Sequence, residues 1–112
     1  MIDQIRPAEL SAWLEQHAHE QPVVLDVRDP VEWAAARVQP EGFELVHIPM
    51  DQLPARLGEL DPDRPLACLC HHGVRSQRVA MFLVHNGFGQ VVNIAGGIDA
   101  WSAQRDTRIA QY

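Results

Sequence analysis

The residues of this chain that most plainly could do chemistry are a cysteine, two histidines, a glycine and an arginine in one short segment. That segment reads Cys70-His71-His72-Gly73-Val74-Arg75-Ser76. Successive backbone N–H groups at the start of a helix, curled by a glycine, form a concave nest that stabilises an anion. A cysteine thiolate is such an anion, and the nest favours this nucleophilic form near neutral pH. We therefore expect Cys70 to be reactive, with the guanidinium of Arg75 as a permanent cation beside the sulfur.

The alternation of apolar runs and helical patterns predicts the scaffold that positions this segment. Strands are predicted at residues 23–25, 43–48, 66–69 and 91–94. Helices are predicted from Pro7 to about His17, at residues 31–36, 52–60 and 77–84, and from Gly97 through Trp101. Strands that alternate with helices imply an α/β fold, in which a parallel sheet lies between helical layers and the crossovers are right-handed. Cys70 then lies at the carboxyl end of a strand, where sites form in such sheets.

Length and composition indicate one domain over residues 1–112, with residues 103–112 as a polar tail of no predicted course. Of the 112 residues, 46% are hydrophobic and 21% are charged, which is enough apolar material for a core. We find neither the pattern of a secretory signal nor an apolar run of bilayer length, so we expect no membrane partner. The two cysteines, Cys68 and Cys70, are separated by one residue, which favours a reducing, cytoplasmic setting over a disulfide scaffold.

The charge balance indicates what kind of partner this chain binds. Fifteen acidic residues and nine arginines give a formal net charge of -6, which disfavours binding to nucleic acid. Groups that can carry positive charge gather without an acidic neighbour at His71, His72, Arg75 and Arg78. We therefore expect a small anion to bind there.

Three further motifs flank the cysteine segment and follow a fixed order along the chain. They are Asp26-Val27-Arg28 followed by Glu32-Trp33, then Ile48-Pro49-Met50, and finally Gly96-Gly97-Ile98 with Trp101. Together with the cysteine segment they resemble the small single-domain members of the rhodanese family, over roughly residues 23–101. The resemblance implies a three-layer rhodanese-like α/β fold with a central parallel sheet of about five strands flanked by helices. Residues 36–42 depart from the pattern of many relatives, so the resemblance does not extend to the donor preference.

The resemblance also implies an activity, which is sulfur transfer through a persulfide on Cys70. Cys70 would accept a sulfane sulfur from a small anionic donor such as thiosulfate or a glutathione persulfide. It would then pass that sulfur to cyanide, to a thiol or to the thiol of a partner protein, in two covalent steps. Asp26 and Arg28 would support the loop, and the residues expected to bind the anion are Arg75, His71, His72, Gly73, Val74 and Ser76. We expect no cofactor and no metal.

Three other functions fit parts of the same pattern. Phosphatases of the same broad fold place five residues between the cysteine and the arginine, whereas the four in this chain close a smaller cradle that suits sulfur. A zinc or copper site could use Cys68, Cys70, His71 and His72, although adjacent histidines rarely converge on one ion. A persulfide sensor or docking module without turnover needs the same thiol, so the sequence leaves this alternative open.

Other side chains near the segment have simpler expected roles. Cys68 is expected to be a core cysteine, since it lies within an apolar strand. Arg28 and Glu32, four residues apart across a helix start, are expected to form a local ion pair. The side chains of His71 and His72 are expected to project to solvent, because a nest binds anions through backbone N–H groups.

Overall fold

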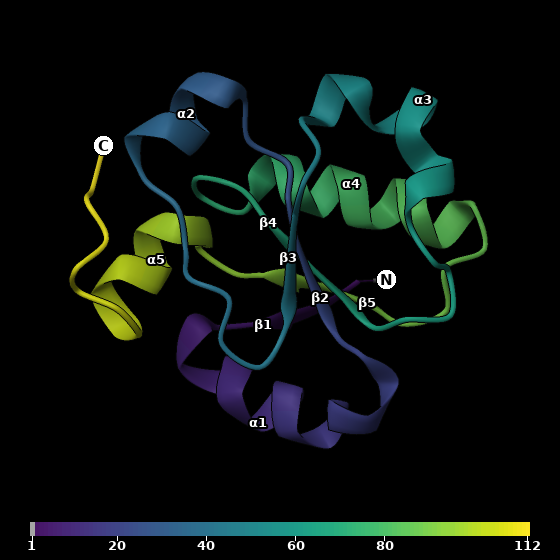
Figure 1. Ribbon diagram of the computed structural model, residues 1–112, viewed down its shortest axis with the longest axis horizontal. Helices are drawn as coiled ribbons and strands as arrows, with labels where there is room; N and C mark the ends of the chain where they lie inside the picture. The colour runs from purple at the N-terminus through teal and green to yellow at the C-terminus, as the bar shows by residue number, and fades with distance from the viewer. Residues whose placement is uncertain (1) are drawn as a thin grey trace.

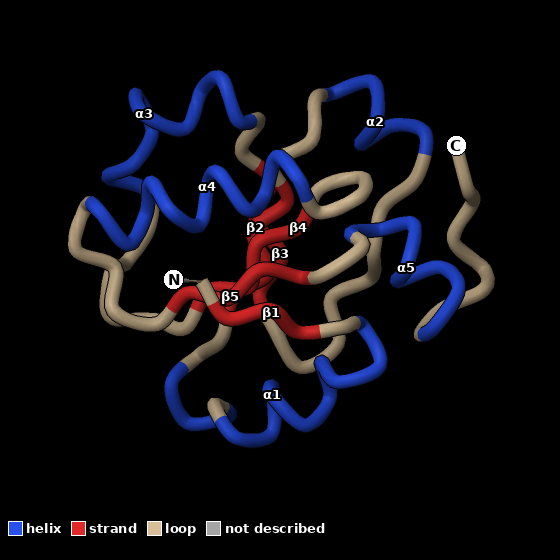
Figure 2. The backbone as a smooth tube through the Cα atoms, turned by 180° about the vertical axis from the view of Figure 1, so that it is seen from behind, coloured by secondary structure: helices blue, strands red, loops and turns tan. Residues whose placement is uncertain are grey.

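A five-stranded parallel sheet forms the centre of the computed structural model, which describes residues 2–112 (Figure 1, Figure 2). The strands are β1 (Asp3–Ile5), β2 (Val23–Asp26), β3 (Glu44–His47), β4 (Leu66–Leu69) and β5 (Val91–Ile94). Their order in the sheet is β1-β5-β4-β2-β3, and every neighbouring pair is parallel. The expected α/β fold with about five parallel strands is confirmed.

Five α-helices and several single turns of 3-10 helix connect the strands. The α-helices are α1 (Leu10–Gln16), α2 (Pro30–Ala35), α3 (Leu53–Arg56), α4 (Val74–His85) and α5 (Gly97–Gln104). The 3-10 turns are Pro7–Glu9, Ala18–Glu20, Met50–Gln52 and Leu57–Glu59. Within residues 2–112, no helix is long and apolar enough to cross a membrane.

Two apolar clusters fill the spaces on either side of the sheet. One joins α3 and α4 to the strands, with Leu53, Leu83, Leu25 and Cys68 among its members. The other joins α1 and α5 to the opposite face, with Leu10, Trp101, Val24 and Leu69 among its members. Strand residues therefore alternate between the two clusters, as the twofold period of a strand requires.

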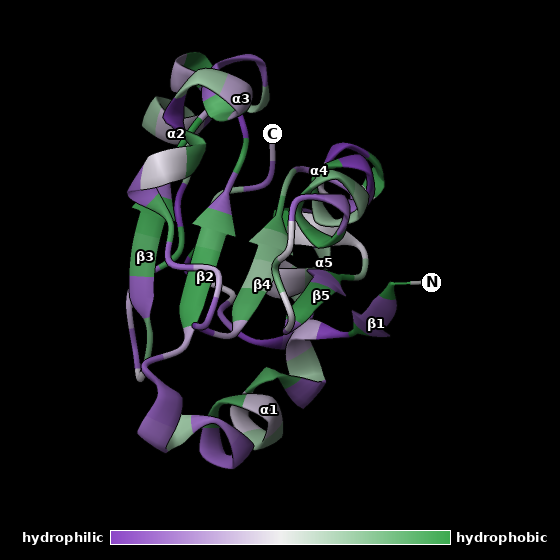
Figure 3. Ribbon diagram, turned by 90° about the vertical axis from the view of Figure 1, so that its right-hand side faces the viewer, coloured by the Kyte–Doolittle hydropathy of each residue, from purple (hydrophilic) through white to green (hydrophobic). Residues whose placement is uncertain are grey.

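The central strands are the most apolar part of the chain. Every residue of β2 and of β4 is buried, which is the pattern of a parallel strand covered on both faces. Figure 3 shows both strands mostly in the colours of hydrophobic residues, whereas the edge strand β1 is mostly hydrophilic. The apolar runs at residues 23–25 and 66–69 predicted these two strands for this reason.

Several elements differ from the expectation, and one of them is α5, which ends at Gln104 and not at Trp101. β1 was not predicted, because two of its three side chains are exposed and polar; it exists through its pairing with β5. The helix expected at residues 52–60 is α3 with a 3-10 turn on each side, since Pro54 fits only in the first turn of a helix and Gly58 weakens the following turn. α4 begins at Val74 rather than at residue 77, so its first turn includes part of the cysteine segment.

A buried ion pair fixes the loop that leaves β2. Asp26 and Arg28 are both 0% exposed, and their charged groups approach to 2.7 Å. The guanidinium also donates to the backbone carbonyl of Glu32 at 3.1 Å. The expected side-chain ion pair between Arg28 and Glu32 is therefore wrong, because the carboxylate of Asp26 lies nearer and is equally buried.

We expect Asp26→Asn to lower the free energy of unfolding by about 3–5 kcal/mol, because it leaves a buried guanidinium without a negative partner. Chemical denaturation followed by circular dichroism measures this change. Asp106→Asn is the matched control, since it breaks a pair with the exposed Arg108 and should change stability little. Equal small effects of the two substitutions would contradict the assignment of the buried pair.

Candidate functional site

Cys70 lies directly after β4, and its sulfur accepts hydrogen bonds from the loop that follows. The Sγ atom is 3.0 Å from the backbone nitrogen of Gly73 and 3.3 Å from that of Ser76. The hydroxyl of Ser76 lies at 3.3 Å as well. Cys70 is 1% exposed, so these donors take the place of water around the sulfur. This arrangement suits an anionic sulfur, because both N–H groups belong to the start of α4.

Gly73 has the backbone conformation that allows this approach. Its φ is 100°, in the left-handed region, and it caps the N-terminus of α4. A Cβ atom added here would lie 3.1 Å from the backbone nitrogen of Gly96. Glycine therefore meets both the conformational and the spatial demand at this position.

The start of α5 holds the opposite side of the same loop. The backbone nitrogen of Ile98 donates to the carbonyl of Cys70 at 2.8 Å, and that of Asp99 donates to the carbonyl of His71 at 3.1 Å. Gly97 has a φ of 61°, and a Cβ atom there would lie 2.4 Å from both carbonyl oxygens. The sequence indicated Gly97 as part of a motif but not this role, since nothing in the motif says what the glycine faces.

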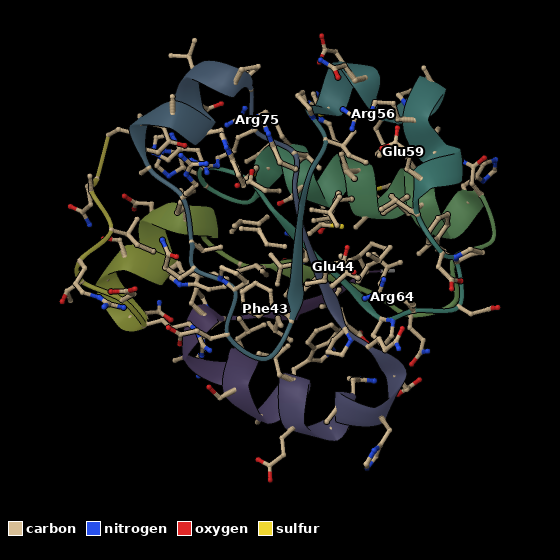
Figure 4. All side chains as sticks on the ribbon, in the orientation of Figure 1. Phe43, Glu44, Arg56, Glu59, Arg64 and Arg75 are labelled. Carbon is tan, nitrogen blue, oxygen red and sulfur yellow. The ribbon has the colours of Figure 1, made fainter. Side chains whose placement is uncertain are left out.

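Arg75 is held by a carboxylate of α2. Its guanidinium nitrogens lie 2.6 and 2.8 Å from the two carboxylate oxygens of Glu32, and Figure 4 shows Arg75 between α2 and α4. These hydrogen bonds are the main reason why the pKa of Glu32 falls to about 2; burial opposes this effect. The same carboxylate raises the pKa of Arg75. Among residues 2–112, Arg75 makes no hydrogen bond to the sulfur, so its role as an anion partner stays a prediction.

Three aromatic rings form a stack beside the cysteine. The ring of His71 lies 3.9 Å from the ring of His72 and 3.9 Å from that of Tyr112, with interplanar angles of 25° and 13°. His72 is exposed, as expected, but His71 is partly buried, which was not expected. Burial lowers the pKa of His71, and the neighbouring charge of His72 adds to this effect.

Tyr112 links the stack to the two ion pairs. Its hydroxyl accepts a hydrogen bond from Arg28 at 2.9 Å and donates one to Glu32 at 2.8 Å. Burial raises the pKa of Tyr112 to about 12, so the hydroxyl keeps its proton and remains a donor. No sequence pattern predicts this role for Tyr112, because the residue lies 84 positions from Arg28.

The remaining predicted residues divide between the core and the surface. Cys68 is 0% exposed, and burial raises the pKa of its thiol to about 12, as befits a core cysteine. Val74 is 66% exposed at the first position of α4. Most of the segment 36–42 lines a groove together with residues of the C-terminal segment; the lining includes Arg37, Pro40, Ile109 and Ala110.

The structure does not bring together the four metal ligands considered from the sequence. Within residues 2–112, the candidate ligands that lie close together are His71, His72 and Asp99, and neither cysteine belongs to this group. The rings of His71 and His72 are stacked at an interplanar angle of 25°, so the nitrogen lone pairs, which lie in the ring planes, lie in two nearly parallel planes.

Comparison with known proteins relates this chain to a family of proteins. Residues 7–104 match the sequence model of the family described as Rhodanese-like domain. A protein of Allochromatium vinosum named "Sulfurtransferase" is 33% identical over 102 residues, which cover 91% of this chain and 90% of that protein. A protein of Glaesserella parasuis named "Thiosulfate sulfurtransferase GlpE" is 36% identical over 90 residues, which cover 80% of this chain and 79% of that protein.

A solved structure shows the same fold along the whole chain. The rhodanese-like domain protein of Staphylococcus aureus superimposes with a TM-score of 0.78 and is 28% identical. The alignment covers 99% of each chain, so the two proteins share the same overall fold.

We expect Gly97→Ala to destabilise the protein and to slow the alkylation of Cys70 by a small reagent. The added Cβ would collide with the carbonyl oxygens of Cys70 and His71, so the loop that holds the sulfur would have to move away from the start of α5. Thermal unfolding and the rate of carbamidomethylation measure the two effects. Gly58→Ala is the control, because a Cβ there meets no atom within 4 Å. Alkylation as fast in Gly97→Ala as in Gly58→Ala would contradict the proposed contact.

The lowered pKa of Glu32 predicts how the Glu32–Arg75 pair responds to acid. A carboxyl whose pKa is lower in the folded state stabilises the fold above its usual pKa of 4.5, and loses this effect as the pH falls toward 2. The difference in unfolding free energy between the wild type and Glu32→Gln should therefore be constant above about pH 5 and shrink below it. Urea denaturation over a pH series measures this difference. A difference that is flat throughout the acid range would rule out the pair as its source.

Proposed function

Because the chain belongs to the rhodanese-like domain family, we propose that it is a sulfurtransferase which carries a sulfane sulfur as a persulfide on Cys70. Relatives named sulfurtransferase and thiosulfate sulfurtransferase, at 33% and 36% identity, support this proposal. The single observation that carries it is the convergence of three hydrogen-bond donors, two backbone amides and one hydroxyl, on the sulfur of Cys70.

The reaction takes place in two displacements at sulfur. In the first, the thiolate of Cys70 attacks the outer sulfur of a donor such as thiosulfate, a new S–S bond forms, and sulfite leaves with the electrons of the broken S–S bond. In the second, an acceptor attacks the outer sulfur of the persulfide, and the thiolate of Cys70 leaves with the electron pair. Cyanide becomes thiocyanate in this step, and a thiol becomes a persulfide. Dividing the transfer in this way is covalent catalysis with ping-pong kinetics.

The loop stabilises negative charge on sulfur in both displacements. The amides of Gly73 and Ser76 are fixed before the donor arrives, so they need no rearrangement as charge develops. Electrons balance within each displacement, so the transfer requires no metal and no cofactor. His71, His72 and Val74 belong to the loop that surrounds the sulfur and would border the donor. Arg75 would add positive charge that Glu32 largely cancels.

The chemistry of the site also defines the partners that we propose. They are a small anionic sulfur donor and an acceptor, which is cyanide, a thiol or the thiol of a partner protein. We propose neither nucleic acid nor a membrane as a partner. A transfer that starts from a reduced cysteine is suited to a reducing setting, and we therefore propose a cytoplasmic location.

The position of Arg75 supports sulfur over a phosphoryl group as the transferred group. Phosphate recognition by an arginine uses both of its terminal nitrogens on the ligand. Here those nitrogens bind the two oxygens of Glu32. With four residues between Cys70 and Arg75, the cradle is also shorter than a phosphate loop.

We expect incubation with thiosulfate to add one sulfur atom to the protein, and cyanide to remove that sulfur as thiocyanate. Intact mass spectrometry measures the first step, and colorimetric detection of thiocyanate measures the second. Cys70→Ser should abolish both steps, because it removes the nucleophile. Cys68→Ser is the matched control and should retain them, because Cys68 is buried and its thiol stays protonated.

The same experiment separates turnover from sensing. A wild-type protein that takes up sulfur but releases none to cyanide or to small thiols would be a persulfide sensor or docking module. Thiocyanate formation at an unchanged rate in Cys70→Ser would overturn the proposal altogether.

A further inference from the structure

Asn93, on β5, is a buried polar side chain that contacts the cysteine loop at two points. It is 2% exposed. Its amide nitrogen donates to the carbonyl of Gly73 at 3.1 Å and to the side-chain oxygen of Gln4 at 2.8 Å. Both amide hydrogens are thus used on acceptors, which fixes the orientation of the amide. Its oxygen therefore faces the hydroxyl of Ser76, with which it forms a hydrogen bond.

The hydroxyl of Ser76 lies between two acceptors and has one hydrogen to give. It is fully buried, 3.3 Å from the sulfur of Cys70 on one side and bonded to the oxygen of Asn93 on the other. When Cys70 is a neutral thiol, the S–H group can donate to the hydroxyl oxygen while the hydroxyl donates to Asn93. When the sulfur carries negative charge, it becomes the stronger acceptor, and the hydroxyl hydrogen turns toward it. The oxygen of Asn93 then loses its donor.

We propose that Asn93 is a positioning residue that acts on Cys70 through Ser76, by competing with the sulfur for the hydroxyl hydrogen. The part of this inference that concerns the reaction cycle rests on the proposed function. When the persulfide forms, negative charge leaves the inner sulfur, and the hydroxyl returns to Asn93. When the acceptor removes the outer sulfur, charge develops on the inner sulfur as the leaving group, and the hydroxyl turns back to it.

The contact with Gly73 gives Asn93 a second, purely structural effect that the experiment has to separate from the first. The side-chain amide of Asn93 holds the carbonyl of Gly73, and so keeps Gly73 in the position in which its N–H group points at the sulfur. Removing the Asn93 side chain would therefore also loosen the loop. This loosening is independent of the Ser76 hydroxyl, so it persists when Ser76 is replaced by alanine.

The test is a double-mutant cycle on the ionisation of Cys70, which is followed by the ultraviolet absorbance of the thiolate as a function of pH. Cys68 does not interfere, because burial raises its pKa to about 12. Ser76→Ala should move the titration to higher pH, because it removes a donor to the anion. The shift that Asn93→Ala causes is measured with Ser76 present and again in the Ser76→Ala background. With Ser76 present, this shift of the Cys70 titration should lie further toward lower pH. The difference between backgrounds should be about half to one pH unit, the size of one neutral hydrogen bond.

Asn86→Ala is the matched control, since it removes an exposed asparagine amide that donates to the backbone carbonyl of Phe82, at the end of α4 far from the cysteine loop. Its titration should coincide with that of the wild type. Asn93→Val, which suits a strand, gives the same comparison if the alanine variant does not fold. Equal shifts for the Asn93 substitution in both backgrounds would overturn the proposal and leave a structural role alone. The titration uses no sulfur donor, so a failure of the proposed function would be seen separately as absent sulfur uptake.

Discussion

A sulfur atom enclosed by protein can carry negative charge only if hydrogen-bond donors replace the water that it has lost. Cys70 meets this constraint with N–H groups from the start of α4. Those groups can point inward because the carbonyls of Cys70 and His71 turn away from the sulfur and bind the first amides of α5. The loop after β4 thus joins two helix N-termini, one that faces the sulfur and one that holds the backbone behind it. Gly73 and Gly97 stand where these two contacts leave no space for a side chain.

The sequence predicted the parts of the fold in which local pattern and environment agree. Residues 66–69 and 91–94 are strands as expected, because their apolar runs are buried between two helical layers. β1 has no such pattern, since Asp3 and Gln4 are exposed and only the neighbouring β5 makes this segment a strand. The helix expected at residues 52–60 failed for a different reason. Pro54 fits only in the first turn of a helix and Gly58 weakens the next turn, so the segment forms short turns in place of one helix.

The candidate site was predictable where its chemistry lies within one segment, and not where it depends on distant partners. The nest around Cys70 was expected from the order of residues in the loop. Glu32 was paired with Arg28 because of their spacing, yet it binds Arg75, which is 43 positions away. Tyr112 and Asn93 lie 84 and 20 positions from the groups they contact at Arg28 and Gly73. Such contacts are decided by which strands and helices become neighbours, and a single sequence does not show this.

The bidentate contact between Glu32 and Arg75 would also affect how the proposed anionic donor reaches the sulfur. The carboxylate cancels most of the positive charge beside the loop, and the chain as a whole carries a formal charge of -6. Backbone dipoles act over a short range, within about one helical turn, so they attract the donor only when it is already near. Association is therefore governed by collision and not by electrostatic steering, and ionic strength would act mainly by screening repulsion. For the proposed donor, selection among anions would then take place at contact, where a terminal sulfur either fits against the amides or does not.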